Sequence, residues 1–188
     1  MRITGGVARG RPLRAPRGPK VRPTADKVRG AIFNILATRI DVADQRWLDL
    51  FAGSGALGLE ALSRGAAWVL FVDESRDSCR VIRENLERSG FASRGEARRL
   101  MLPQGLRSVA RSGLRFHGSF VDPPYRRGLC PATLDGLGDG TLLLPDALVV
   151  VEHGSDETLA ERYGRLQRTD TRRYGSTAIS LYANVEDP

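Results

Sequence analysis

Short apolar runs alternate along the chain with stretches in which apolar residues recur at helical spacing. Each apolar run, such as 68–73 or 147–153, predicts a strand covered on both faces, because such a strand carries apolar side chains toward both. Weaker runs with the same residue types lie between turn signals. Seven strands are predicted in this way, at 47–51, 68–73, 98–102, 119–122, 147–153, 164–172 and 177–183.

The segments between these runs predict helices. After Thr24, which suits a helix N-cap, Val28 and Ile32 fall on one helical face, and Lys27 and Arg29 fall on the other. Further helices are expected at 56–63, 75–89, 106–109, 129–137 and 155–162. Repeating strand-helix units are typical of an α/β fold. We expect a seven-stranded, mostly parallel sheet with helices on both faces, closed by an antiparallel hairpin.

Positive charge gathers at the N-terminus. The 188-residue chain has a formal net charge of +7, and nearly all its cations are arginine, whose forked guanidinium binds phosphate and stacks on bases. A GC-rich genome would also raise the arginine content, so the position of the charges is more informative. Nine cations lie in residues 1–29, against a single acid, Asp26. This distribution is typical of a surface that binds a polyanion.

The charge pattern divides the chain into a basic arm or small hairpin at 1–23 and one globular domain at 24–188. Two short extended pieces in the arm are joined around residues 7–10. Deleting residues 1–20 is expected to leave folding intact. No apolar run approaches the roughly 20 residues of a membrane span, and no secretion signal is recognised. Neither the two cysteines nor the two histidines have metal-ligand spacing, so we expect no metal site. The two cysteines also form no disulfide framework, which predicts reduced thiols and a cytoplasmic location.

The stretch 48–61, LDLFAGSGALGLEA, places a glycine turn between a strand and a helix. Glycines allow the backbone to approach a ligand closely, and the helix N-terminus presents N–H groups to it. Gly53, Gly55 and Gly58 match the dinucleotide pattern G-x-G-x-x-G, and Asp73 lies 20 residues beyond Gly53, where a ribose-binding acid is expected. A nicotinamide dinucleotide is therefore one candidate ligand.

The same turn fits a second ligand. Asp49, Phe51, Gly53 and Gly55 match D-x-F-x-G-x-G, which resembles the S-adenosylmethionine (SAM) site of Rossmann-like methyltransferases. Asp49 discriminates between the two, because a carboxylate at the end of the first strand suits a cationic ligand and repels a pyrophosphate. The turn therefore favours SAM over a dinucleotide.

A second motif, Asp122-Pro123-Pro124-Tyr125, directly follows a predicted strand. Ligands of open α/β sheets bind beyond the carboxyl ends of the strands, so we expect this motif to lie beside the glycine turn. Asp122 and the Pro123 carbonyl can accept both N–H groups of a planar amine, while Tyr125 offers a stacking face. Accepting both bonds favours a pyramidal nitrogen whose lone pair points at the SAM methyl, which is positioning and electrostatics.

With both motifs placed, the chain resembles the bacterial small-subunit (16S) ribosomal RNA guanine-N2 methyltransferase family over essentially its full length. The resemblance rests on ITGGVARGRPL, RPTADKVRGAIFNIL, LDLFAGSGALGLEALSRGA and FVDPPYRRGL, of which the first two are the most specific. It implies a monomeric class I methyltransferase that converts SAM to S-adenosylhomocysteine. The implied partner is 16S rRNA or the assembling small subunit.

The resemblance also implies site residues. For the cofactor they are Asp49, Phe51, Gly53, Gly55, Asp73, Gln104 and Asp122; for catalysis on the target guanine they are Asp122, Pro123 and Tyr125. For the rRNA they are Arg9, Arg11, Arg22, Thr24, Lys27, Arg29, Arg126 and Arg127. Two positions depart from the family pattern: Gly30 replaces a glutamate, and in 100–104 only Gln104 could contact the adenine amine.

Other functions remain open from the residues alone. The second motif also suits N6-adenine or N4-cytosine methylation of DNA, although no extra domain for reading a duplex is predicted. A protein-glutamine methyltransferase usually has asparagine in place of Asp122. A non-catalytic RNA-binding module and a NAD-dependent oxidoreductase are the alternatives from other classes, and ligand titration separates them.

Overall fold

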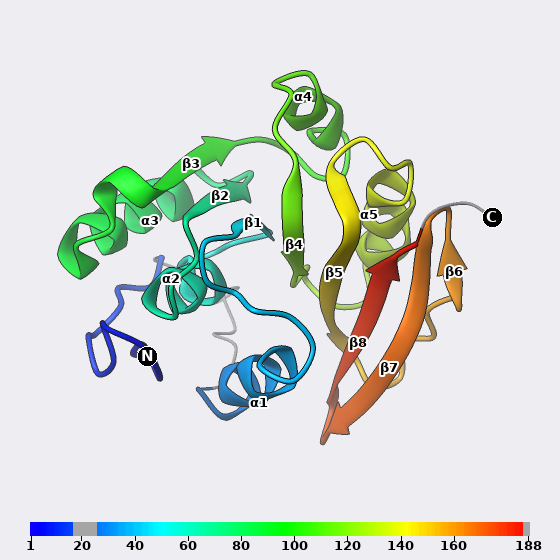
Figure 1. The fold of residues 1–188 in the computed structure, drawn as a ribbon, viewed down its shortest axis with the longest axis horizontal. Coiled ribbons are helices and arrows are strands. Elements are labelled where there is room, and N and C mark those ends of the chain that lie inside the picture. Colours follow the sequence, from blue (N-terminus) through cyan, green and yellow to red (C-terminus); the bar gives the residue numbers. More distant parts are fainter. Residues whose placement is uncertain (17–25, 186–188) are drawn as a thin grey trace. The chain divides into compact units, whose positions relative to one another are not determined.

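The computed structural model describes residues 1–16 and 26–185, and the chain divides into two compact units, Met1–Leu100 and Met101–Pro188 (Figure 1). Of the expected rRNA-binding residues, Arg22 and Thr24 lie outside the described residues. No helix in the described part of the chain is long and apolar enough to cross a membrane.

The first unit is built on three parallel strands in the order β3-β2-β1. Helix α2 packs on β1 and β2, and α3 packs on β2 and β3. The elements are α1 (Asp26–Leu36), β1 (Arg46–Leu50), α2 (Ala56–Ser63), β2 (Trp68–Asp73), α3 (Arg76–Ser89), the 3-10 turn η1 (Ala92–Arg94) and β3 (Gly95–Arg99). Both β1 and β2 are apolar and buried along most of their length, as their composition predicted.

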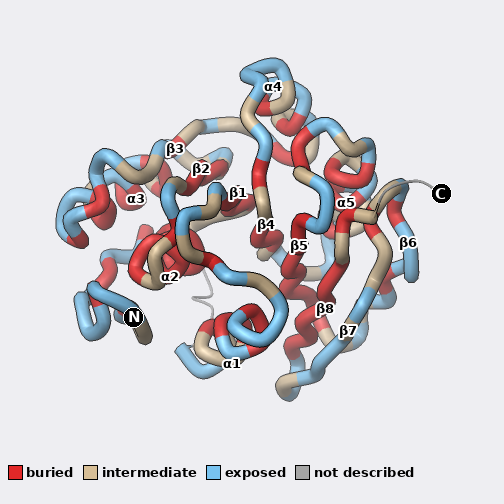
Figure 2. Tube along the Cα trace, in the orientation of Figure 1, coloured by how far each residue is buried: buried red, intermediate tan, exposed pale blue. Residues whose placement is uncertain are grey.

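Helix α2 is buried along its whole length, as Figure 2 shows. Its close approach to β2 depends on Gly58, because a Cβ atom there would lie 2.8 Å from Val69 Cγ1 and would overlap the Phe71 ring. The third glycine of the G-x-G-x-x-G pattern therefore allows helix and strand to pack together.

The N-terminal hairpin, residues 1–13, belongs to the first unit and packs on its helix α2. Its two arms are joined by a bridge between Arg2 and Pro12 and by a bond from Ile3 N to Arg11 O at 3.0 Å. Its apolar side chains Ile3, Ala8 and Leu13 are buried. This burial makes the hairpin part of the core of the first unit, so deleting residues 1–20 is expected to destabilise it, contrary to the expectation from the sequence.

The buried carboxylate of Glu60 in α2 holds this hairpin in place. It accepts hydrogen bonds from the backbone N–H and the hydroxyl of Thr4, both at 2.8 Å, and from Arg64 Nε at 3.0 Å. Arg29 of α1 approaches the same carboxylate at 3.4 Å and also donates to the Arg2 carbonyl. One buried acid thus connects α1, α2 and the N-terminal hairpin.

Within its described residues, the second unit holds two helices and five strands of mixed direction. Its strands follow the order β4-β5-β8-β7-β6, parallel between β4 and β5 and antiparallel in the other pairs. The helices are α4 (Leu106–Ala110) and α5 (Leu129–Leu137). The strands are β4 (Phe116–Val121), β5 (Leu143–Gly154), β6 (Arg162–Tyr163), β7 (Leu166–Tyr174) and β8 (Thr177–Asn184).

Two of the predicted elements differ from the structure. The helix expected at 155–162 is absent: these residues form a turn that leads into β6, so the described residues hold eight strands and not seven. The backbone of this turn bonds to another strand in place of a helix: the Ala160 carbonyl accepts a hydrogen bond from the Tyr182 hydroxyl of β8 at 2.7 Å. The strand expected at 98–102 runs instead from Gly95 to Arg99.

Candidate functional site

The glycine turn after β1 has a backbone path that most residues avoid. Phe51, Gly53 and Gly55 have φ values of 59°, 55° and 78°. Glycine adopts such values without strain, whereas a phenylalanine does so at a cost of about 1–3 kcal/mol. Backbone strain of this kind concentrates at ligand-binding sites, and Phe51 carries it directly beside the two glycines of this turn.

Asp49 lies beneath the turn, and only 1 % of its surface is exposed. Its Oδ2 accepts a hydrogen bond from Gly58 N at 2.9 Å, so the carboxylate caps α2, whose N-cap residue, Gly55, has no side chain to do so. Burial raises the pKa of Asp49 to about 8, the Gly58 bond lowers it and the nearby charge of Asp73 raises it further. The Asp49 carboxyl group is therefore covered by the protein and held by the start of α2.

Asp73 ends β2 and links two loops. Its Oδ2 accepts from Gly53 N at 2.9 Å, and its Oδ1 accepts from Ser75 N at 2.8 Å. A carboxylate oxygen has two lone pairs, so each oxygen can still accept a bond from a ribose hydroxyl. The structure therefore brings together the glycine turn and the acid that the sequence placed 20 residues beyond it.

The described structure adds Asn85, which the sequence reasoning missed. This fully buried amide of α3 donates to the Ser54 carbonyl at 2.9 Å, directly within the glycine turn. It also exchanges hydrogen bonds with the backbone of Arg14, both at 2.9 Å. A buried polar residue on the apolar face of a predicted helix was the signal that could have identified it, because such groups are retained where they have partners.

In the second unit, the loop Asp122 to Tyr125 follows β4, as predicted. Pro123 is buried, Pro124 is exposed, and Asp122 and Tyr125 are partly exposed. The Tyr125 hydroxyl donates to Glu152 Oε1 at 2.9 Å and lies 3.1 Å from Thr177 Oγ1. Burial is the main reason that the pKa of Tyr125 is raised. The hydrogen bond to Thr177 lowers this pKa, and the nearby carboxylates of Glu152 and Asp122 raise it further. The phenol therefore stays protonated over the physiological range.

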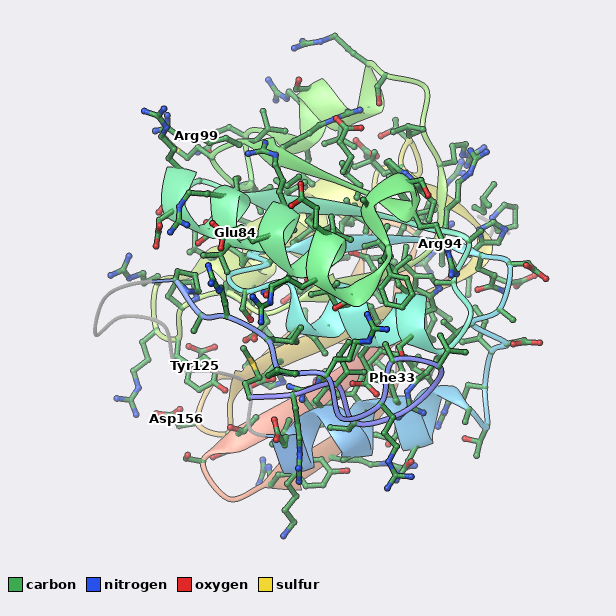
Figure 3. All side chains as sticks on the ribbon, turned by 90° about the vertical axis from the view of Figure 1, so that its left-hand side faces the viewer. Phe33, Glu84, Arg94, Arg99, Tyr125 and Asp156 are labelled. Carbon is green, nitrogen blue, oxygen red and sulfur yellow. The ribbon has the colours of Figure 1, made fainter. Side chains whose placement is uncertain are left out.

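The two arginines that follow this loop differ in their surroundings. Arg126 has a φ of 60° and pairs with Asp156, whose Oδ2 lies 2.7 Å from Arg126 Nη2. Both side chains are exposed, and Figure 3 shows Asp156 at the same edge of the molecule as Tyr125. Arg127 is exposed. A phosphate near this loop would have to compete with Asp156 for Arg126.

The other expected rRNA-binding residues are placed as follows. Arg9, Arg11 and Lys27 are exposed, and Arg11 Nη1 donates to the Arg88 carbonyl at 2.8 Å. The expectation that Arg29 contacts rRNA at the surface is wrong. Its side chain is fully buried and bonds to Glu60, Asp26 and the Arg2 carbonyl. Gln104, the candidate for the adenine, is exposed just before α4.

Comparison with known proteins agrees with this geometry. A curated relative from Escherichia coli (strain K12), named ribosomal RNA small subunit methyltransferase D, is 43% identical over 152 residues, 81% of this chain and 74% of the relative. A relative of the same name from Haemophilus influenzae is 32% identical over 188 residues, 98% and 94% of the two chains. The solved structure of the Escherichia coli putative methyltransferase yhhF is 36% identical in sequence. The match covers 100% of this chain and 99% of the yhhF chain, with a TM-score of 0.85.

The α/β fold, the glycine turn with its two acids and the Asp-Pro-Pro-Tyr loop define a Rossmann-like methyltransferase that uses SAM. An RNA methyltransferase from Salinibacter ruber, solved with S-adenosyl-L-homocysteine, shares this fold at 18% identity and a TM-score of 0.65. More narrowly, the chain belongs to the family described as Conserved hypothetical protein 95, whose model matches residues 1–183.

Proposed function

We propose that the protein transfers the methyl group of SAM to the exocyclic N2 amine of a guanine in 16S rRNA, free or in the assembling small subunit. The observation that carries this proposal is the intact Asp122-Pro123-Pro124-Tyr125 loop in a chain whose 43%-identical relative is named ribosomal RNA small subunit methyltransferase D. A substrate of this kind places the enzyme in the cytoplasm.

The first unit binds the cofactor in this proposal. The glycine turn approaches the methionine part of SAM, and Asp73 accepts the ribose hydroxyls with the lone pairs that Gly53 and Ser75 leave. Asp49 adds negative charge beneath the turn. A buried carboxylate whose pKa is about 8 loses its proton readily when a cation approaches, so a cationic ligand and the ionised form of Asp49 stabilise each other.

The second unit holds the guanine. Asp122 and the Pro123 carbonyl accept the two N–H bonds of the N2 amine, and Tyr125 stacks on the ring. Bound SAM would supply the methyl group: the N2 nitrogen would form the new N–C bond, and the electrons of the broken S–CH₃ bond would stay on sulfur. S-adenosylhomocysteine and one proton from N2 are released. The protein contributes positioning and electrostatic stabilisation to this step.

The test compares Asp122→Ala with Asp135→Ala, which removes an exposed carboxylate from α5. We expect Asp122→Ala to lower turnover at least about a hundredfold, as loss of a positioning acceptor does, and to leave SAM affinity within a few-fold. Asp135→Ala should match the wild type. Mass spectrometry of 16S rRNA nucleosides, with naked rRNA and small-subunit particles as substrates, measures N2-methylguanosine, and calorimetry measures SAM binding. Near-normal turnover in Asp122→Ala would rule out the proposed role of this loop.

A further inference from the structure

Two strands of the second unit converge on the hydroxyl of Tyr125. Glu152 lies near the end of β5, and Thr177 begins β8. The Tyr125 hydroxyl donates to Glu152 Oε1 at 2.9 Å and lies 3.1 Å from Thr177 Oγ1. A phenol has one proton and two lone pairs, so with Glu152 accepting, the Thr177 hydroxyl is left to donate. Both the proton and one lone pair of Tyr125 are then committed to the protein.

The groups that hold this hydroxyl are themselves fixed. Glu152 is 7 % exposed and Thr177 is 4 % exposed. The two strands pair in antiparallel register, with Glu152 opposite Ile179 and Gly154 opposite Thr177. Tyr125, in contrast, lies in an irregular loop after β4 and is partly exposed. The sheet thus fixes the far end of a side chain whose own backbone lies outside any strand or helix.

We propose that Glu152 and Thr177 are positioning residues that hold the Tyr125 ring at one orientation, as a fixed stacking face for the target base. This inference rests on the proposed function, in which Tyr125 stacks on the guanine. A tyrosine held only at its Cβ can rotate about two side-chain bonds, whereas hydrogen bonds to its hydroxyl remove most of that freedom. The base then meets a preorganised surface, and less ordering is needed when it is captured.

A consequence for specificity follows. Because Tyr125 gives its proton to Glu152 and accepts one from Thr177, it has no proton to donate to the base and presents mainly its aromatic face. Stacking on an aromatic face tolerates every base. The recognition of a guanine amine is therefore assigned to the acceptors Asp122 and Pro123, and Tyr125 sets only where the ring plane lies.

The test is a double-mutant comparison of steady-state kinetics on 16S rRNA. Tyr125→Phe removes the hydroxyl itself, whereas Glu152→Ala and Thr177→Val each remove one of its two partners. We expect each to lower kcat/KM for rRNA about three- to tenfold, the usual effect of one hydrogen bond, and to leave KM for SAM within twofold. Glu152→Gln retains an acceptor oxygen and should recover most of the loss.

The decisive variant is Tyr125→Phe combined with Glu152→Ala. If Glu152 acts through the tyrosine hydroxyl, the double variant is no slower than Tyr125→Phe alone. A general structural role would lower kcat/KM by the same factor in both backgrounds, following the loss in Tm, and that result would overturn the proposal, as would normal kinetics in Glu152→Ala.

Failure of the proposed function gives a different result. If the wild-type protein methylates another base and leaves 16S rRNA guanine unmodified, the proposed substrate is wrong. The same set of variants, assayed on the base that is methylated, still decides whether Glu152 works through Tyr125.

Discussion

Asp49 combines two roles that oppose each other energetically. Its side chain caps α2 through Gly58 and, when ionised, places a negative charge beneath the glycine turn. Burial is the main reason that its pKa is raised from 3.8 to about 8, which means that the ionised form is costly in the unliganded protein. Ionisation of Asp49, which its proposed role toward a cationic cofactor requires, therefore lowers the stability of the folded protein.

Replacing Asp49 with asparagine should make this cost measurable. The folded protein binds the Asp49 proton more tightly than the unfolded chain, so this residue's contribution to stability falls as pH rises from about 4 to about 8. Its slope is up to about 1.4 kcal/mol per pH unit. Asparagine does not ionise, and it retains an acceptor for Gly58 N. Urea denaturation should therefore show Asp49→Asn gaining stability over the wild type across this window, while calorimetry shows weaker SAM binding. A stability difference that does not vary with pH would contradict the assignment.

At the scale of elements, the packing of α2 on β2 depends on a missing side chain. The Cβ atom of an alanine at position 58 would overlap the Phe71 ring and lie 2.8 Å from Val69 Cγ1. Gly30, in α1, is a matched control, because a Cβ atom there meets nothing within 4 Å. Both glycines lie inside helices, where alanine alone is more favourable by about 1 kcal/mol.

The two substitutions should therefore have opposite signs. Gly30→Ala should raise the free energy of unfolding by about 0.5–1 kcal/mol. Gly58→Ala gains the same helix propensity but overpacks the interface, so a net loss of about 1–2 kcal/mol is expected. Urea denaturation of both variants checks the pair. Equal gains in the two would show that α2 moves away from β2 at little cost.

Elements whose pattern arises from burial were predictable from the sequence. The apolar strands β1 and β2 were placed to within a residue or two, because a strand buried on both faces has little choice of residues. The helix expected at 155–162 failed for the opposite reason. Its single buried apolar residue, Leu159, gives no helical face, and Asp156 and Glu157 instead contact Arg126.

The site could be predicted only in part. The glycine turn and Asp73 were identified by a sequence motif. The turn requires glycines at fixed spacings, and the acid follows at a fixed distance along the chain. The partners of Tyr125 lie 27 and 52 residues away, and no local pattern connects them. Arg29 was assigned to the outer face of α1 because arginine is rarely buried; the structure buries it against Glu60, a pairing between distant segments.

For the whole molecule, the net charge of +7 is the feature most relevant to a polyanionic substrate. Not every cation contributes equally. Arg9 is exposed on the N-terminal hairpin, whereas Arg29 is fully buried and pairs with Glu60. The first is available to phosphate, and the second holds the hairpin against the first unit.

Arg9→Gln and Arg29→Gln should separate these two uses of arginine. Arg9→Gln is expected to reduce the slope of log affinity for rRNA against log salt by about 0.7, without changing the free energy of unfolding. Arg29→Gln should lower that free energy by about 3 kcal/mol, because it leaves the buried Glu60 carboxylate with one cation, Arg64, in place of two. Fluorescence titrations at several salt concentrations and urea denaturation measure the two effects. A reduced stability in Arg9→Gln, with an unchanged salt slope, would contradict this division.

The N-terminal hairpin is folded against α2, with three apolar side chains buried and its backbone bonded to that helix. Segments that fold only when they bind bury large apolar areas at that moment and give a strongly negative heat-capacity change. A hairpin that is already packed has no such area left to bury. The heat of association with rRNA should therefore vary little with temperature, and affinity should be lost to heating only when the first unit itself unfolds.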